Sequence, residues 1–573
     1  MDAYSFDTYT QLFKYITTHY DNPTFLNYLK DGEYESISTA DFKQRVSYLA
    51  LALEEFGVKE YDSVALFAKP SPCWLIFDFA LQLVKAVSVP IFEDISQKNL
   101  DFELHDSQIK YIFTDHTKYI YDIDDEITII GCNIVAKNKK FITVSELMER
   151  GKLLYKTKSD EIENMIHSVG PDYLFSVVYT SGNTGIPKGV ELTQSNIVSQ
   201  LHAIHQLYPL KKGAKALTLL PLAHIFERTV MSYYLSCGIS IYFVDDVHNV
   251  APLMKKVKPN IMTVVPRLLE KIYLKIEEKV YEKKGFEGLV ARLAFQRARQ
   301  KKYSKPTLID KLFSKLVYNK FLESFGGELE VLVSGGANLD KELYNFFLNI
   351  GLPLYQGYGL TETSPVISVN YPGNNKAGTC GKPLPNVKVK LNKDNELLTK
   401  GQHVMRGYRN QEGMTQETID QDGWLHTGDL ASIDEEGYIT IQSRKKELLK
   451  TSTGKYISAV AIEQAITQSK YIDYAIVVGN DRQFVTALLF MNPELVPKDI
   501  NAETFYKQSD IKSQIIAHIK RVNATLDQWE KVVKYAIITN KISIDGGELT
   551  PSMKIRRNEI ESKYKKIIDN MYK

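Results

Sequence analysis

The sequence predicts an α/β protein with a large N-terminal domain, residues 1–443, and a small C-terminal α+β domain, residues 444–573. Short apolar runs alternate with helix-length segments up to about residue 356, which is typical of mostly parallel sheets flanked by helices. From about residue 370, short alternating runs broken by Gly, Pro and Asn favour an antiparallel, β-rich subdomain. Short strands and helices then mix in a highly charged segment, which indicates the separate C-terminal domain.

The first predicted helix covers residues 39–57. Thr39 is a suitable N-cap, apolar residues follow at helical spacing, and Gly57 ends the pattern. Buried strands are predicted from apolar runs at 63–67, 86–90, 111–114, 174–179, 216–220, 239–243, 261–265, 329–334 and 354–356, and in the last domain at 474–478 and 486–490.

Residues 267–327 are the least sheet-like part of the chain and are predicted to form a helical insert. Basic residues stand there among apolar ones at roughly helical spacing: Arg292, Arg297, Arg299, Lys301, Lys302, Lys305, Lys311 and Lys315. Two interpretations stay open. The insert is either a solvated helical addition to the sheet domain, or a basic amphipathic surface that lies on anionic lipid.

Length and composition narrow the class of protein. A chain of 573 residues is longer than a single hydrophobic core usually supports, so two or more domains are expected. A net charge of +2 gives no general attraction to nucleic acid. The four cysteines are widely spaced, so neither a disulfide framework nor a zinc site is expected. The acidic start is unlike a signal peptide, and no apolar run approaches eighteen residues. We therefore expect a cytoplasmic protein, with peripheral membrane contact as the alternative.

The strongest functional signal is the string Tyr-Thr-Ser-Gly-Asn-Thr-Gly-Ile-Pro-Lys-Gly at residues 179–189. Glycine-rich turns expose backbone N–H groups that bind anions, and a lysine adds charge against phosphate oxygens. The string lacks the Gly-Lys-Ser/Thr of the common ATPase loop, because Pro187 precedes Lys188. A Ser/Gly surface loop is the alternative when such a string is seen alone. The candidate phosphate-binding residues are Thr180, Ser181, Gly182, Thr184 and Lys188.

A second string, Gln-Gly-Tyr-Gly-Leu-Thr-Glu-Thr, occupies residues 356–363. Gly357 and Gly359 allow the backbone to approach a ligand closely, and Tyr358 can offer its face to a purine. Thr361 and Glu362 suit a magnesium ion held by one carboxylate and phosphate oxygens. Without the first string, a structural tyrosine in a glycine-containing turn would explain these residues equally well.

Two further strings complete the set. In Gly-Trp-Leu-His-Thr-Gly-Asp-Leu, residues 423–430, Asp429 follows a turn glycine and can accept hydrogen bonds from ribose hydroxyls. The alternative for Asp429 is a turn-capping role. In Pro-Leu-Ala-His-Ile-Phe-Glu-Arg, residues 221–228, His224 can orient a carboxylate or pyrophosphate, or it is a core histidine with its hydrogen bonds satisfied.

Together these strings resemble the signatures of the adenylate-forming (AMP-binding) superfamily over residues 10 to 565. The segments 221–228 and 265–272, with Leu-Thr-Pro-Ser-Met-Lys-Ile at 549–555, are most similar to its long-chain fatty acid–CoA ligase (acyl-CoA synthetase) branch. The resemblance implies that Ser334-Gly335-Gly336-Ala337 and Gln356 line an adenine and that Arg444 lies near the ribose and phosphate. It also implies that Lys554 serves adenylation, Lys446 is a hinge to a mobile C-terminal domain, and Gly454 lies in the loop for the coenzyme A step. Ser443 and Thr453 stand where many relatives carry glycine.

The function that the resemblance implies has two half-reactions. A fatty carboxylate attacks the α-phosphorus of Mg-ATP, and the acyl-adenylate then passes its acyl group to coenzyme A. The residues expected to act on the reacting groups are Thr180, Lys188, His224, Glu362 and Lys554. Two alternatives stay open. The acceptor thiol belongs to an acyl carrier protein, or the chain is a nucleotide- or lipid-binding relative without turnover.

Overall fold

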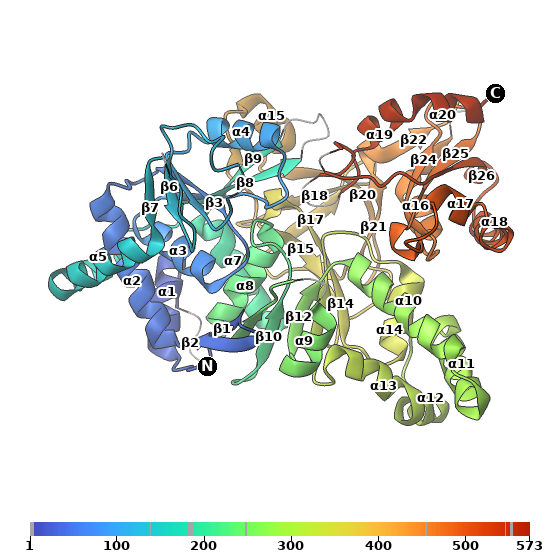
Figure 1. The fold of residues 1–573 in the computed structure, drawn as a ribbon, viewed down its shortest axis with the longest axis horizontal. Coiled ribbons are helices and arrows are strands. Elements are labelled where there is room, and N and C mark those ends of the chain that lie inside the picture. The colour runs from blue at the N-terminus through green and yellow to red at the C-terminus, as the bar shows by residue number, and fades with distance from the viewer. Residues whose placement is uncertain are drawn as a thin grey trace. The chain divides into compact units, whose positions relative to one another are not determined.

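The structure is a computed structural model that describes residues 5–117, 119–137, 139–181, 187–246, 249–452, 455–544, 546–550 and 554–573 (Figure 1). Three residues with predicted roles, Gly182, Thr184 and Gly454, lie outside the described residues. So do the side chains of Ser181 and Lys446.

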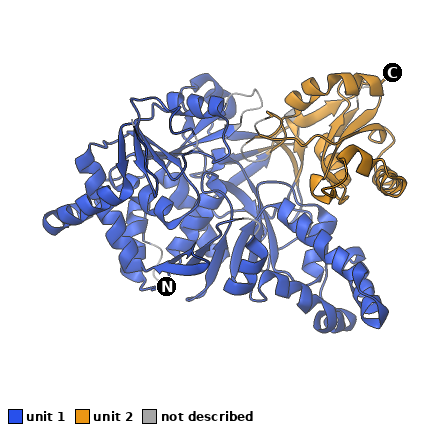
Figure 2. Cartoon of the chain, viewed as in Figure 1, with its two compact units in different colours: residues 1–390, 398–427, 433–440 blue, residues 391–397, 428–432, 441–573 orange. Residues whose placement is uncertain are grey.

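The chain forms two compact units (Figure 2). Unit 1 comprises residues 1–390, 398–427 and 433–440, and unit 2 comprises residues 391–397, 428–432 and 441–573. The long C-terminal segment of unit 2 begins close to the boundary predicted at residue 444, and two short segments from the predicted β-rich region belong with it.

One sheet of unit 1 has eight strands in the order β19-β9-β8-β4-β3-β5-β6-β7. Its parallel part runs from β8 to β7, whereas β8 pairs with β9, and β9 with β19, in antiparallel fashion. The strands are β3 (Ser63–Phe67), β4 (Val87–Pro90), β5 (Tyr111–Thr114), β6 (Thr128–Gly131), β7 (Phe141–Thr143), β8 (Leu174–Ser181), β9 (Pro187–Thr193) and β19 (Gly407–Tyr408).

The second sheet of unit 1 has nine strands in the order β16-β15-β14-β13-β12-β10-β11-β1-β2. Its centre, from β1 to β14, is parallel, and antiparallel strands close both edges. The strands are β1 (Leu26–Lys30), β2 (Glu33–Ile37), β10 (Lys215–Thr218), β11 (Ser240–Phe243), β12 (Ile261–Val264), β13 (Val331–Ser334), β14 (Leu354–Gly359), β15 (Val366–Val369) and β16 (Lys382–Pro383).

Helices cover these sheets because their apolar faces need burial. They are α1 (Tyr9–His19), α2 (Thr39–Phe56), α3 (Pro72–Leu83), α4 (Gln97–Asp106), α5 (Val144–Lys158), α6 (Glu161–His167), α7 (Gln194–Leu207), α8 (Ile225–Ser236), α9 (Val250–Val257), α14 (Lys341–Asn349) and α15 (Glu412–Thr418).

Helix α2 corrects one detail of the prediction, since its N-cap is Ser38 and not Thr39. The Ser38 hydroxyl accepts from the backbone N–H of Asp41, and the Asp41 carboxylate accepts from the backbone N–H of Ser38. This reciprocal pair satisfies two backbone donors at once, which Thr39 as the cap would not. Gly57 closes the helix at φ +104° as predicted.

The insert between β12 and β13 is helical: α10 (Pro266–Glu282), α11 (Gly285–Gln300), α12 (Leu308–Phe313), the π-helix η2 (Ser314–Tyr318), α13 (Asn319–Leu322) and the 3-10 turn η3 (Glu323–Phe325) (Figure 1). Helices α10 and α11 bury Ile276, Val280 and Phe295 in one core with α14. None of the helices in the described ranges combines the length and the apolar character needed to span a bilayer.

A further sheet has the order β17-β18-β20-β21, formed by β17 (Lys388–Leu391), β18 (Glu396–Lys400), β20 (Leu425–Ile433) and β21 (Ile439–Arg444). Unit 2 adds the hairpin β22 (Leu448–Lys450) and β23 (Tyr456–Ser458). Its three-stranded sheet consists of β24 (Ile472–Val478), β25 (Val485–Met491) and β26 (Val532–Ile538).

Unit 2 has a core on each face of this three-stranded sheet. Successive residues of a strand point to opposite faces, so Val477 packs with α16 (Ala459–Thr467) and α18 (Ser509–Ala524), whereas Ile476 packs with α19 (Arg557–Lys563) and α20 (Lys565–Met571). The helix α17 (Ala502–Tyr506) and the 3-10 turn η6 (Pro493–Leu495) lie between β25 and α18 in the chain. The predicted fold, a large α/β part with mostly parallel sheets followed by a smaller α+β part, is confirmed.

Candidate functional site

The first predicted motif lies on an antiparallel hairpin. Strands β8 and β9 pair so that Thr180 stands opposite Lys188 and Ser181 opposite Pro187. The tip between them, residues 182–186, is outside the described residues. The strand pairing places the half-buried Thr180 and Lys188 side by side on neighbouring strands.

Tyr408 connects this hairpin to the second motif. Strand β19 pairs with β9, with Tyr408 opposite Val190. The Lys188 ammonium lies over the Tyr408 ring, 5.1 Å from its centroid, and the Tyr408 hydroxyl donates a 2.7 Å hydrogen bond to Glu362 Oε1. Two predicted site residues from distant strings, Lys188 and Glu362, are therefore held by one tyrosine that the sequence did not single out.

Glu362 belongs to a short 3-10 turn, η4 (Thr361–Thr363), whose position is set by the backbone bond from Met405 N–H to Glu362 O at 2.9 Å. Its second oxygen, Oε2, makes no hydrogen bond with the described residues. Within the described ranges, no cluster of three or more His, Cys, Asp or Glu could hold a metal ion. A divalent cation at Glu362 would therefore depend on one carboxylate plus oxygens from a phosphate ligand, a ligand set that suits magnesium.

The loops after β13 and β14 meet at the same edge of the nine-stranded sheet. The two strands are parallel, with Ser334 opposite Gln356. The Gln356 Nε2 lies 3.5 Å from Asn338 Oδ1, and Gln356 itself is buried. These contacts bring Gly335, Gly336 and Ala337 next to the 356–363 string.

Two glycines in these loops are required by close packing. A Cβ on Gly335 would lie 2.9 Å from the Phe226 ring, and one on Gly359 would lie 1.8 Å from the backbone oxygen of Pro365. Neither position therefore accepts a side chain without displacing its neighbour. Tyr358, next to Gly359, and Thr361, two residues after it, are half-buried.

His224 caps the N-terminus of α8. Its Nδ1 accepts a 3.2 Å hydrogen bond from the backbone N–H of Phe226, so the neutral ring carries its proton on Nε2. Because the Phe226 ring packs against Gly335, His224 belongs to the same edge of the sheet as the 334–337 loop.

Glu227 holds this end of α8 on the sheet. It is fully buried and accepts from the hydroxyls of Thr218 at 2.5 Å and Thr263 at 2.7 Å, at the ends of β10 and β12. Burial raises the pKa of Glu227 to about 7. Glu227 is not among the predicted site residues; its place within the His224 string was the one available signal.

In unit 2 the structure brings Asp429 and Arg444 together. They lie on the neighbouring strands β20 and β21, and Arg444 Nε is 3.0 Å from Asp429 Oδ1. The Asp429 side chain is 3% exposed and that of Arg444 is 41% exposed. The carboxylate is thus oriented by the guanidinium and buried, whereas the guanidinium is partly exposed.

Lys446 and Lys554 are the remaining predicted residues of unit 2 that the structure describes. Lys446 is the middle residue of the 3-10 turn η5 (Lys445–Glu447), directly after β21. Lys554 is exposed and is placed by two hydrogen bonds with Thr550: Thr550 N–H donates to Lys554 O at 2.8 Å, and Lys554 N–H donates to the Thr550 hydroxyl at 3.0 Å. Gly454, between β22 and β23, lies outside the described residues.

Known proteins match this chain in sequence over nearly its whole length. The family described as AMP-binding enzyme matches residues 13–409, and the family described as AMP-binding enzyme C-terminal domain matches residues 446–573. The chain is 31% identical to the long-chain-fatty-acid–CoA ligase FadD15 of Mycobacterium bovis, over 96% of this chain and 95% of that one. It is 29% identical to the rat long-chain-fatty-acid–CoA ligase 5, over 96% and 86%.

Among solved structures, the adenylation domain of a carboxylate reductase from Mycobacterium chelonae matches with a TM-score of 0.76 and 19% identity, over 99% of this chain and 91% of that one. At that identity the likeness concerns the fold. The resemblance inferred from the sequence strings, to the adenylate-forming superfamily and its acyl-CoA synthetase branch, is confirmed.

Proposed function

The chain belongs to the AMP-binding enzyme family, and from this premise we propose that it is a long-chain fatty acid–CoA ligase. It uses ATP to convert a fatty acid to an acyl-adenylate, releasing pyrophosphate, and then transfers the acyl group to coenzyme A, releasing AMP. Relatives that match almost end to end carry this name. The observation in the structure that carries the proposal is the joint placement of Lys188 and Glu362 by Tyr408.

The first half-reaction needs no general base. A fatty carboxylate with a pKa of about 4 is already ionised at neutral pH, so the protein has only to position it and offset negative charge. Thr180, Ser181 and Lys188 would bind phosphate oxygens, and His224 would orient the carboxylate or the leaving pyrophosphate through its Nε2 proton. Glu362 would hold Mg²⁺, which neutralises phosphate charge when bound. Lys554 would bring a second cation to the reacting carboxylate and α-phosphate.

The nucleotide would be recognised by the 334–337 and 356–359 segments of unit 1 and by two residues of unit 2. Gly335, Gly336, Ala337, Gln356, Gly357, Tyr358 and Gly359 are proposed to line the adenine, and Asp429 and Arg444 the ribose and phosphate. The pair formed by Asp429 and Arg444 supports this, since a buried, oriented carboxylate is suited to accept from two vicinal hydroxyls.

The second half-reaction is proposed to use unit 2 in a second orientation. Lys446, in the short turn after β21, would be the hinge, and the loop containing Gly454 would serve the coenzyme A step. Adenylate is a good leaving group, so this step mainly requires orientation of the thiol and exclusion of water.

Coenzyme A, and not an acyl carrier protein, is the acceptor that the named relatives favour. A non-catalytic nucleotide- or lipid-binding role is not favoured either, because Lys188, Glu362, Asp429, Arg444 and Lys554 are all present. No nucleic-acid partner is proposed.

The test is release of AMP and pyrophosphate by the purified chain with Mg-ATP, coenzyme A and a panel of carboxylic acids from acetate to oleate. We expect release that depends on the acid and on coenzyme A and that is greatest for long chains. Absence of pyrophosphate with every aliphatic acid would refute the ligase, and turnover with a carrier protein but not with coenzyme A would refute the proposed acceptor.

A further inference from the structure

The helical insert differs in charge from the rest of the chain. Residues 267–327 contain fifteen Lys and Arg against seven Asp and Glu, a formal charge of +8. The whole chain carries +2, so the remaining residues carry −6. The positive charge of this protein is therefore concentrated in one structural element and is opposed by net negative charge elsewhere, which orients a protein toward an anionic surface.

The same insert exposes large apolar side chains. Of the seventeen large hydrophobic residues that are exposed among the described residues, nine lie between residues 281 and 316. Phe286, at the start of α11, is 79% exposed, and Leu308, at the start of α12, is 84% exposed. Single exposed apolar residues are common, but a concentration within one short segment marks an interaction surface.

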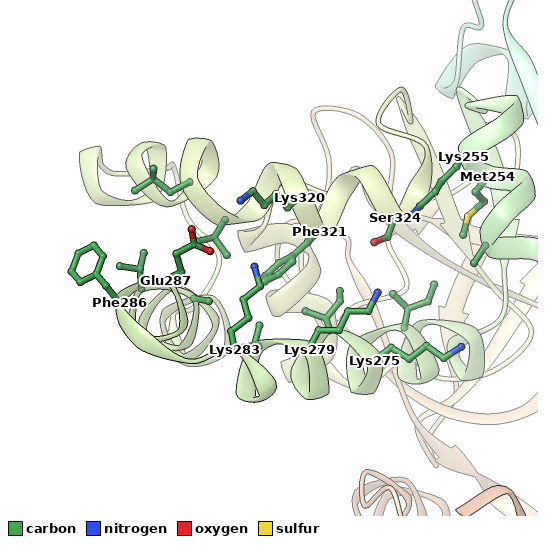
Figure 3. Close-up of a pocket in the computed structure, with 18 residues that line it drawn as sticks. Met254, Lys255, Lys275, Lys279, Lys283, Phe286, Glu287, Lys320, Phe321 and Ser324 are labelled. Atoms are coloured by element: carbon green, nitrogen blue, oxygen red, sulfur yellow. The ribbon is translucent and has the colours of Figure 1, made fainter.

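A pocket of about 420 Å³ opens between α10, α11 and the η2–α13 segment, with α9 at its edge (Figure 3). Its wall is mostly apolar and includes Ile276, Val280, Val290, Val317 and Phe321. The volume lies within the range of about 300–1,000 Å³ that ligand pockets occupy.

Lysines surround this apolar wall. Lys275 and Lys279 stand four residues apart on α10, which places them on one helix face, and Lys283 follows directly after the last residue of the helix. Lys279 and Lys283 extend toward the segment that carries Lys320 and Phe321 (Figure 3). Lys255 lines the α9 side. The pocket lining contains a single carboxylate, that of Glu287.

No ion pair with a carboxylate of the described residues is formed by any of these five lysines. Like charges four residues apart destabilise a helix when they stand alone. Lys275 and Lys279 are such a pair within α10, and an anionic partner would replace their mutual repulsion with attraction.

These observations define the chemistry of the partner. The apolar wall disfavours a bare phosphate or nucleotide, which would lose hydration there without compensation. The lysines disfavour a neutral hydrocarbon as the best ligand, and they match a head group with negative charge. Leu308 and Leu312 on α12 are exposed and do not belong to the pocket wall, so a ligand inside the pocket would not cover them.

We propose that the insert is a docking site for an anionic bilayer, in which the pocket takes up the acyl chain of one anionic lipid. Lys279, Lys283 and Lys320 bind the head group of that lipid, and the exposed apolar residues of α11 and α12 enter the interface. This site is separate from the residues proposed for ligation, and its existence does not depend on the ligase function.

The experiment measures co-sedimentation of the full-length protein with two kinds of vesicle, phosphatidylcholine alone and phosphatidylcholine mixed with phosphatidylglycerol. We expect binding to the anionic vesicles that is at least about tenfold tighter and that weakens as salt is added. Equal affinity for the two kinds of vesicle would overturn the proposal.

Two matched pairs of variants locate the site. Lys279→Glu with Lys283→Glu reverses two pocket charges, and Lys302→Glu with Lys305→Glu makes the same change in net charge elsewhere in the insert. The first pair should weaken binding at least about fivefold more than the second. Val290→Trp fills the pocket and should weaken binding, whereas Leu289→Trp, at the adjacent exposed position of α11, should not.

Thermal melting confirms that each variant is folded, and AMP release with a soluble, medium-chain acid should be unchanged in all of them. Equal effects within either matched pair would remove the pocket from the proposal. Binding of monomeric dodecyl phosphate without binding of vesicles would also overturn it, because the ligand would then be a free amphiphile. Failure of the ligase assay leaves these readouts intact, so the two proposals fail separately.

Discussion

Lys188 and Lys554 are both proposed to act on the triphosphate end of the substrate, yet they are held in different ways. Lys188 is half-buried on β9, a strand that is paired on both sides, and its ammonium rests on the Tyr408 ring. Lys554 is exposed and is placed by two hydrogen bonds with one neighbour, Thr550. The sheet thus fixes one cation in advance, whereas the other lies on the surface of unit 2.

This difference suits the proposed division of labour. A cation that binds phosphate throughout the cycle benefits from a rigid support, because a fixed charge costs no reorganisation during the reaction. A cation needed in only one half-reaction must be able to leave, and elements of low local stability provide such movement.

The largest effect is expected from Lys554→Ala. Loss of a positioned cation should reduce acyl-adenylate formation by about 10²–10³-fold, while thioester formation from synthetic acyl-adenylate is largely kept. ATP–pyrophosphate exchange measures the first step, and single-turnover transfer to coenzyme A measures the second. Lys566→Ala, another exposed lysine of unit 2, is the control and should change neither. An equal loss in both steps would contradict the assignment.

Tyr408→Phe tests the fixed cation site. The variant keeps the ring beneath Lys188 but loses the hydroxyl that orients Glu362, so affinity for Mg²⁺ should fall by about 10–100-fold. Activity titrated with Mg²⁺ at saturating ATP measures this, and excess Mg²⁺ should restore the rate. Tyr408→Leu removes the ring and the hydroxyl together, so excess Mg²⁺ should not fully restore the rate of this variant. If Tyr408→Phe behaves as the native protein, the hydroxyl does not position Glu362.

Lys446→Pro should show the opposite bias to Lys554→Ala. Proline restricts the backbone at the proposed hinge, so transfer to coenzyme A should slow on the order of tenfold while adenylation is retained. The same exchange and transfer assays apply, and thermal melting must show a folded protein. Lys446→Ala, which leaves the backbone free, should preserve both steps. Unchanged transfer in a folded Lys446→Pro protein would place the hinge elsewhere.

The remaining effect is on stability and concerns the support beneath His224. Because burial raises the pKa of Glu227 to about 7, its contribution to stability is complete below about pH 4.5 and is lost as pH rises through about 7. The variant Glu227→Gln should lose this pH dependence of stability, which amounts to about 3 kcal/mol at most in the free energy of unfolding. The melting temperature measured against pH should then be flatter over this range than for the native protein.

Glu103→Gln is the matched control for Glu227→Gln, since burial raises the pKa of Glu103 to about 8. In Glu103→Gln the pH dependence of the melting temperature should be flattened up to a higher pH than in Glu227→Gln. Identical profiles for native protein and Glu227→Gln would show that Glu227 does not titrate as its burial implies.

Local patterns in the sequence were sufficient for many elements. The predicted strands at residues 63–67 and 111–114 coincide with β3 and β5, and Gly57 ends α2 as expected. These features depend on hydrophobic periodicity and on backbone preferences that act over a few residues. The N-cap of α2 was misplaced by one residue, because Ser38 and Thr39 are both suitable caps and only the exchange with Asp41 distinguishes them.

The sequence by itself therefore determined the fold class, the strings that mark an adenylating enzyme, and the glycines that its loops require, because each is encoded within a short run of residues. Only the tertiary structure decided which distant residues meet. It put Tyr408 between Lys188 and Glu362, Arg444 against Asp429, and the free thiols of Cys73 and Cys132 2.8 Å apart. Strand pairing and helix packing across the whole chain create these contacts, and no periodicity in a single segment carries that information.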